Sequence, residues 1–265
     1  MPSRRGWSVA FTAVSGHERR SGCAMFVASR LSKAFGSGVA LQDVSVTLEP
    51  GELTVVLGPS GSGKTTLLRC ISLLEMPDTG SLEMDGVCFA GCKAPADRGL
   101  LYPRLGVVFQ GLSLWPHLTL RDNILLPLKL RESRVDYSYV DQLIDTFGMG
   151  GFVERLPREV SGGERQRAAI VRALALRPAY LLLDEITSAL DIEQVVVVLN
   201  ELERLKRDGA GILLITHLMG FARRAAENFI FLDKGRIVER GPVAQLDDPQ
   251  SNRLSKFLQH IGTAG

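Results

Sequence analysis

Residues 58–66 read GPSGSGKTT, and this stretch constrains the fold of the chain more than any other. Its glycines and the pair Lys64-Thr65 have the spacing of a phosphate-binding loop, whose curled backbone points N–H groups at anionic oxygens. An apolar run, residues 53–57, predicts a strand before the loop, and residues 65–74 have a helical pattern after it. Strand, glycine loop and helix in this order indicate a nucleotide site at the start of the helix.

The residues of this loop are candidate ligands of the nucleotide. Lys64 can reach the β- and γ-phosphates, and the Thr65 hydroxyl can bind Mg²⁺. The candidate nucleotide-binding residues of the loop are Gly58, Pro59, Ser60, Gly61, Ser62, Gly63, Lys64, Thr65 and Thr66.

Two later apolar runs end in polar side chains. Residues 181–183 are leucines followed by Asp184 and Glu185, which predicts two carboxylates at the C-terminal end of a buried parallel strand. Asp184 would hold Mg²⁺ there, and Glu185 would orient or deprotonate an attacking water. Residues 212–215 predict a second strand of the same sheet, so His217 near its end can hydrogen-bond a γ-phosphate.

A second candidate anion site lies at residues 161–167, which read SGGERQR. Ser161 is a good N-cap, and residues 168–176 are strong helix formers. Ser161, Gly162 and Gly163 would present free N–H groups, a hydroxyl and the helix dipole to an anion. A plain helix cap would be sufficient to explain this stretch if it occurred alone. It does not explain why the stretch occurs in the same chain as a phosphate-binding loop and a pair of carboxylates.

Taken in order, these motifs resemble those of the nucleotide-binding subunit of an ATP-binding cassette (ABC) transporter, from about Met25 to the C-terminus. GPSGSGKTT matches the Walker A loop, VSGGERQR the signature and LLLDE the Walker B strand. Gln110, residues 188–191 and His217 match the Q-loop, the D-loop and the switch histidine. The resemblance implies an α/β P-loop NTPase core with a mostly parallel sheet, a flanking antiparallel β-subdomain and an α-helical subdomain.

The same resemblance implies an ATPase that uses ATP and Mg²⁺. Two copies, or one copy and a paralogous subunit, would pack head to tail, so that residues 161–163 of one close over ATP bound to the other. Phe35 falls where the family places a ring that stacks on adenine, more often Tyr than Phe. The implied catalytic residues are Glu185, His217 and Gln110, and the implied metal ligands are Thr65, Gln110 and Asp184. Ile186 stands where the family often has proline, but no catalytic position is missing.

Charge and hydropathy restrict the partners. The formal net charge is +2 and no long basic stripe appears, which argues against nucleic acid as the main partner. No run of 18 apolar residues occurs, so transport would need separate transmembrane permease subunits. The expected location is peripheral, at the cytoplasmic face of the inner membrane, with a solute-binding protein as a further partner.

Two stretches indicate the transported solute. Residues 114–119, after the Q-loop, and residues 248–258, near the C-terminus, resemble bacterial polar amino acid importers, and no C-terminal β-domain follows. Import of polar amino acids is the hypothesis, and a cassette for another solute is the alternative. A soluble ABC ATPase of translation or DNA maintenance is a second alternative, although those usually carry two cassettes or long coiled coils. A P-loop kinase or GTPase is a third alternative, but such an enzyme would not need the helix that begins with SGGER, residues 161–165.

The domain boundaries follow from composition. Residues 1–24 are rich in arginine and lack periodicity, which predicts a disordered extension, with an upstream start before Met25 or a transit peptide as alternatives. Residues 25–265 form the ATPase domain. Within it, residues 111–160 switch to helical periodicity and predict the inserted helical subdomain. Residues 161–240 alternate helix and strand, which predicts a parallel sheet.

Two further predictions concern cysteines and an apolar segment. Cys23, Cys70, Cys88 and Cys92 lack the second ligand pair that a zinc site needs, so reduced thiols are expected. Leu112, Leu114 and Trp115 follow Gly111 and predict a docking surface for the membrane subunit. The alternative, that Trp115 belongs to the core of the helical subdomain, remains open at this point.

Overall fold

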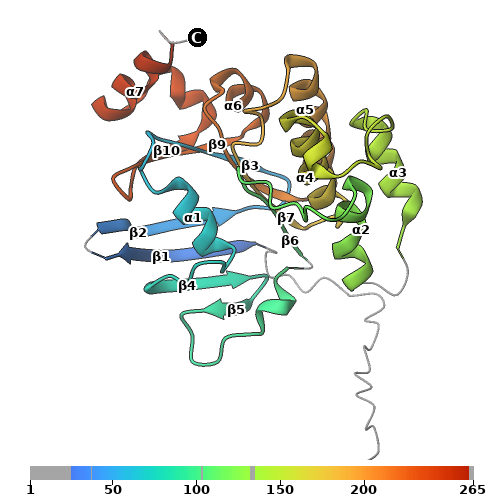
Figure 1. Ribbon diagram of the computed structural model, residues 1–265. Helices are drawn as coiled ribbons and strands as arrows, with labels where there is room; N and C mark the ends of the chain where they lie inside the picture. Colours follow the sequence, from blue (N-terminus) through green and yellow to red (C-terminus); the bar gives the residue numbers. More distant parts are fainter. Residues whose placement is uncertain (1–24, 37, 103, 132–134, 263–265) are drawn as a thin grey trace, which may run out of the picture.

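The computed structural model describes residues 25–36, 38–102, 104–131 and 135–262 (Figure 1). The predicted disordered extension, residues 1–24, and Cys23 within it lie outside the described residues. Ten strands of the described part form two sheets. The four-stranded antiparallel sheet has the order β2 (Gly38–Leu48), β1 (Phe26–Phe35), β4 (Thr79–Met84), β5 (Val87–Ala90). The six-stranded sheet has the order β10 (Arg236–Pro242), β9 (Asn228–Asp233), β3 (Leu53–Leu57), β8 (Gly211–Ile215), β7 (Tyr180–Asp184), β6 (Leu105–Val108).

Seven α-helices and three short 3₁₀ helices complete the described part of the chain. The α-helices are α1 (Lys64–Ile71), α2 (Leu120–Arg131), α3 (Tyr137–Thr146), α4 (Gly162–Leu174), α5 (Ile192–Arg207), α6 (Met219–Ala225) and α7 (Asn252–Gly262). The 3₁₀ helices are η1 (Arg98–Leu100), η2 (Pro157–Glu159) and η3 (Val243–Asp247). The segment predicted as a helical subdomain, residues 111–160, thus contains α2, α3 and η2.

Both faces of the six-stranded sheet are covered. Successive residues of a strand point to opposite faces, so neighbours such as Val55 and Val56 in β3 enter different cores. Val55 belongs to the core that contains residues of α2 to α6, and Val56 belongs to the core that contains residues of α1 and the antiparallel sheet. Figure 1 shows α1 lying over the antiparallel sheet, with α4 and α5 on the other side of the molecule. Burial on both faces explains why the central strands β3, β7 and β8 are nearly all apolar, whereas the edge strand β10 is not.

The predicted strand directions hold except at one edge. Strands β3, β6, β7, β8 and β9 run parallel, but β10 pairs antiparallel with β9. Lys234 and Gly235, with φ of 49° and 75°, form a tight turn that reverses the chain. The first helix also differs from prediction: it ends at Ile71, because Leu73 has φ of 56°, which a right-handed helix cannot contain.

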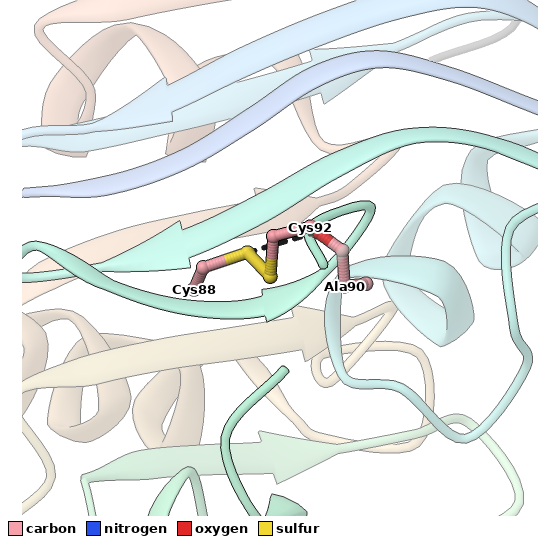
Figure 2. Close-up of a disulfide and its surroundings, with 3 residues drawn as sticks. All are labelled: Cys88, Ala90 and Cys92. Atoms are coloured by element: carbon pink, nitrogen blue, oxygen red, sulfur yellow. Dashed lines mark hydrogen bonds between the residues drawn. A yellow bond between two sulfur atoms is a disulfide. The ribbon is translucent and has the colours of Figure 1, made fainter. Parts of the chain in front are cut away.

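The expectation of reduced thiols is wrong for one pair of cysteines. Cys88 in the edge strand β5 and Cys92 in the loop after it form a disulfide, and Figure 2 shows Ala90 beside the bond. Gly91, with φ of 76°, turns the chain so that the two Cα atoms lie 6.6 Å apart, within the range a disulfide can bridge. Cys70 is a free, buried thiol whose pKa burial raises to about 11.

No helix in the described part of the chain combines the length and apolar character that a membrane crossing requires.

Candidate functional site

The phosphate-binding loop lies at the carboxyl edge of the parallel sheet, between β3 and α1. Three of its glycines have positive φ: Gly58 at 151°, Gly61 at 76° and Gly63 at 104°. A Cβ atom at Gly63 would collide with the Ala40 carbonyl of β2, whereas nothing lies within 4 Å of a Cβ at Gly61. A Cβ atom at Gly58 would likewise collide with the Leu232 carbonyl of β9, so the loop is packed tightly against the strands at two glycines and open at Gly61, as an anion cradle requires.

The Lys64 side chain turns back onto the backbone of this loop. Its ammonium donates hydrogen bonds to the carbonyl oxygens of Gly58, at 2.8 Å, and Pro59, at 2.9 Å. Burial lowers the pKa of Lys64, and the nearby carboxylates of Glu185 and Asp184 partly oppose that shift. The Ser62 hydroxyl is buried and has no hydrogen-bond partner in the described residues. The unpaired Ser62 hydroxyl and the Lys64 ammonium are both hydrogen-bond donors within the loop, so the loop fits an anionic ligand.

The predicted metal ligands meet across two elements. The Thr65 hydroxyl at the start of α1 donates to a carboxylate oxygen of Asp184, at the end of β7, over 2.8 Å. Burial is the largest influence on Asp184 and raises its pKa, while the Thr65 hydrogen bond lowers it. A buried carboxylate beside a hydroxyl offers the oxygen ligands that Mg²⁺ prefers when phosphates supply the others. The residues present therefore fit Mg²⁺.

The three predicted catalytic side chains converge from three strand ends. Glu185 follows β7, Gln110 follows β6 and His217 follows β8. One Glu185 carboxylate oxygen lies 2.7 Å from Nε2 of His217, and the other accepts a hydrogen bond from Nε2 of Gln110 at 3.3 Å. The parallel strands β6, β7 and β8 are neighbours, so their ends meet at one edge.

The backbone of Glu185 is held in an uncommon conformation. Its φ is 51°, a left-handed value that is rare for a residue other than glycine. Its N–H donates to the Ile215 carbonyl at the end of β8, over 3.0 Å, and this bond helps to keep the conformation in place. The side chain remains 24% exposed and borders a cavity of about 390 Å³ that Ser188, Leu190 and His217 also line. A water molecule can reach this carboxylate.

The signature segment, residues 161–167, begins with a residue that caps a helix. Ser161 is the N-cap of α4: its hydroxyl accepts from the Glu164 N–H at 3.2 Å, and the Glu164 carboxylate accepts from the Ser161 N–H at 2.7 Å. This reciprocal pair sharply defines where the helix begins. Ser161 is exposed. Among the described residues, no hydrogen bond joins residues 161–163 to residues 58–66 of the same chain.

Gln166 has a place in this site that the sequence did not reveal. Its side chain is 3% exposed, donates to the Glu185 carbonyl at 3.3 Å and accepts from the Ala189 N–H at 3.1 Å. Gly163 lies against the same segment, since a Cβ there would come within 2.7 Å of the Ala189 carbonyl. The signature helix is thereby packed onto residues 188–191. A single glutamine within a helical pattern gives no sign of these contacts.

Phe35 lies at the end of β1, beside the tip of the β1–β2 hairpin, where it pairs with Gly38. The hairpin returns along β2 to Ala40, whose carbonyl borders Gly63 of the loop. The Phe35 ring is 50% exposed, which is unusual for a large apolar side chain at the end of a core strand. An exposed ring close to a phosphate loop suits stacking on a nucleotide base.

Comparisons with known proteins agree with this geometry. Residues 41–188 match the family model described as ABC transporter. Over 235 residues the chain is 41% identical to the glutamine transport ATP-binding protein GlnQ of Escherichia coli strain K12, covering 87% of this chain and 97% of that protein. It is 38% identical over 241 residues to the glutamate/aspartate import ATP-binding protein GltL of the same strain, covering 89% and 99%.

A solved structure extends the likeness to three dimensions. The dimeric, post-hydrolysis structure of the ATP-binding cassette MJ0796, bound to ADP and Pi, matches with a TM-score of 0.73 at 30% identity. The match covers 82% of this chain and 98% of that one. These findings confirm the predicted family, the α/β fold and the ATPase activity. On the evidence of its loop, its strand-end carboxylates and these relatives, the chain belongs to the ABC transporter family, as an ATP-binding subunit that hydrolyses ATP.

Proposed function

We propose that this chain powers the import of polar amino acids through separate transmembrane permease subunits. The observation that carries the catalytic part is the contact of Glu185 with both Gln110 and His217, beside a loop built for phosphates. The solute class rests on the relatives named for glutamine and for glutamate/aspartate transport, which align along nearly their whole length.

Within the proposed site, residues 58–66 cradle the phosphates of ATP and Phe35 stacks on the adenine. Thr65, Asp184 and Gln110 hold Mg²⁺, which when bound offsets negative charge on the β- and γ-phosphates. Glu185 takes a proton from the attacking water or orients it, and His217 hydrogen-bonds the γ-phosphate. Gln110 contacts Glu185 directly, so one of the proposed metal ligands is hydrogen-bonded to the proposed general base.

The site is completed by a second copy or a paralogous subunit. Ser161, Gly162 and Gly163 lie at a capped helix N-terminus and, in the described part of the chain, make no hydrogen bond to residues 58–66. We propose that they close over ATP bound to the partner. The dimeric structure of the related cassette MJ0796 supports such pairing. In this arrangement the ATP is enclosed only when two subunits meet.

An exposed apolar surface supports the permease as partner. Trp115 is 53% exposed although its backbone is fixed: its N–H donates to the buried Asn123 side chain at 2.7 Å, and the Asn123 amide donates back to its carbonyl at 3.1 Å. Leu112 and Leu114, the other two predicted members of this surface, are instead half-buried and pack against the core, so Trp115 is the exposed ring of the segment. We propose that a permease segment docks on this surface, at the cytoplasmic face of the inner membrane, with a solute-binding protein delivering the solute.

The position of Trp115 leads to a first prediction. Trp115→Ala is expected to leave the melting temperature and basal ATPase activity of the isolated subunit almost unchanged, because an exposed ring contributes little to stability, within about 0.5 kcal/mol. Assembly with the permease should fall, since exposed aromatic residues dominate such interfaces. Thermal melts and co-purification with the permease measure both effects.

Leu125→Ala serves as the matched control. Leu125 lies in α2 nearby and is 5% exposed, so its truncation should destabilise the subunit by about 2–5 kcal/mol. If Trp115→Ala lowers the stability of the subunit as much as Leu125→Ala does, Trp115 belongs to the core and the proposed docking surface is wrong.

Transport itself is tested by reconstitution. The tagged chain is purified from detergent-solubilised membranes, its membrane partner is identified by mass spectrometry, and the complex is placed in proteoliposomes. ATP-dependent uptake of labelled glutamine or glutamate is expected, and Lys64→Ala should abolish it because the phosphates lose their main cation. Purification of the chain from membranes with no membrane protein attached would favour a soluble role, and a complex that takes up neither glutamine nor glutamate would overturn the solute class.

A further inference from the structure

The three residues before Phe35 are all tied to one residue, Asp78, which directly precedes β4. The Asp78 N–H donates to the Ser32 carbonyl at 2.8 Å. One carboxylate oxygen of Asp78 accepts from the Ala34 N–H at 2.8 Å, and the other accepts from the Lys33 ammonium at 3.2 Å. The end of β1 is therefore held at consecutive residues before the exposed ring.

Lys33 is fixed more firmly than a surface lysine usually is. Its ammonium contacts the Glu75 carboxylate at 2.7 Å and donates to the Met76 carbonyl at 2.8 Å in addition to Asp78, so its three N–H groups all have partners. The side chain is 11% exposed, and the Glu75 hydrogen bond is the main reason that its pKa is raised.

The ammonium of Lys33 lies 5.2 Å from the centre of the Phe35 ring. Residues two apart in a strand point to the same face of the sheet, which brings the two side chains together. A cation at this distance from a ring is attracted to the negative charge on its face. Glu75 and Asp78 offset much of the positive charge of Lys33. We therefore expect Lys33 to act on base binding mainly by holding the Phe35 ring in place, and less by attracting the base electrostatically.

We propose that Lys33, held by Asp78, positions the Phe35 ring for stacking on the nucleotide base. Lys33 is then a positioning residue: it supports the ring and does not touch the phosphates. The proposal rests on the proposed function, in which Phe35 is the base platform. A ring that is already ordered loses less freedom when the base binds, which strengthens binding of ATP but not of a ligand without a base.

The test compares ATP with inorganic tripolyphosphate, which has the phosphates but no base. Dissociation constants of both are measured by calorimetry on the full chain. Lys33→Met keeps the aliphatic stem and is expected to weaken ATP binding about two- to fivefold, the range of an exposed cation–ring contact. Tripolyphosphate binding should be unchanged, and Lys33→Arg, which keeps the cation, should restore most of the ATP affinity.

A double variant shows whether Lys33 acts through the ring. Phe35→Ala is expected to weaken ATP binding about 5- to 100-fold, as the loss of one base–aromatic stack does. In that background Lys33→Met should cause no further loss. If Lys33→Met weakens both ligands equally, or costs the same with Phe35 absent, the positioning role is wrong.

Two outcomes separate this proposal from the proposed function. If Phe35→Ala weakens ATP binding and Lys33→Met does not, only the role of Lys33 fails. If Phe35→Ala leaves ATP affinity unchanged, the base platform itself is wrong and the positioning role falls with it. Should Lys33→Met lower the melting temperature, Asp78→Asn takes its place, since the amide oxygen can still accept from Ala34 while the charge that holds Lys33 is lost.

Discussion

Replacing Glu185 with glutamine is expected to lower ATP hydrolysis by roughly 10²- to 10⁴-fold, the range for loss of a general base. The amide has the shape of the carboxylate and can still contact Gln110 and His217, but it cannot accept a proton from water. Asp184 and Thr65 remain, so ATP binding should persist and trap a closed dimer. Phosphate release measures the rate, and size-exclusion chromatography with ATP measures the dimer.

Glu83→Gln is the matched control for this variant. Glu83 is an exposed carboxylate on β4, in the antiparallel sheet, and its replacement makes the same chemical change far from the strand ends that carry the candidate site. Its hydrolysis rate should equal that of the parent. A turnover of Glu185→Gln within threefold of the parent would remove Glu185 from the catalytic role.

Replacing Ser161 with arginine is expected to abolish hydrolysis while the isolated subunit keeps its affinity for ATP. Ser161 is exposed at the start of α4 and, within the part of the chain that the structure describes, has no hydrogen bond to residues 58–66. A large cation there would prevent the signature of one subunit from closing over the γ-phosphate bound to another. Steady-state ATPase assays and ATP titration of the monomeric subunit measure the two properties.

Ser161→Ala is the control variant for loss of the helix cap. Replacing a serine N-cap with alanine costs about 0.5–2 kcal/mol. Arginine likewise cannot accept the hydrogen bond from the Glu164 N–H, so both variants should lose similar stability. The alanine variant adds no bulk and should retain measurable hydrolysis. A tenfold or greater loss of ATP affinity in monomeric Ser161→Arg would mean that both motifs contact one nucleotide within one chain, and the head-to-tail arrangement would be wrong.

The parts of the site that the sequence predicted are those in which local motif and sheet geometry coincide. The loop needs glycines at positions of positive φ, and these occupy 58, 61 and 63. Glu185 and His217 could be placed together because each follows an apolar run, and parallel strands end at the same edge. Gln110 is assigned to the site through the resemblance to the family's Q-loop. The mutual contacts of these three residues confirm that the side chains meet, and the roles assigned to them remain to be measured.

Other features depend on contacts between segments distant in the chain. Gln166 reaches the Glu185 carbonyl and the Ala189 N–H only because α4 packs beside the end of β7. Lys33 meets Glu75 and Asp78 only because β1 pairs with β4. No periodicity in the sequence marks such pairs, since each residue type is ordinary where it stands.

The sequence by itself determined the family, the loop, the strand-end carboxylates and the alternation of helix and strand, because these depend on spacing and on apolar runs. The tertiary structure alone decided that Cys88 and Cys92 are joined, that β10 runs antiparallel and that the Trp115 ring is exposed. The physical reason is that a disulfide, a strand direction and an exposed ring each depend on how the chain turns and packs in space. Gly91, Gly235 and the buried Asn123 set those turns and contacts.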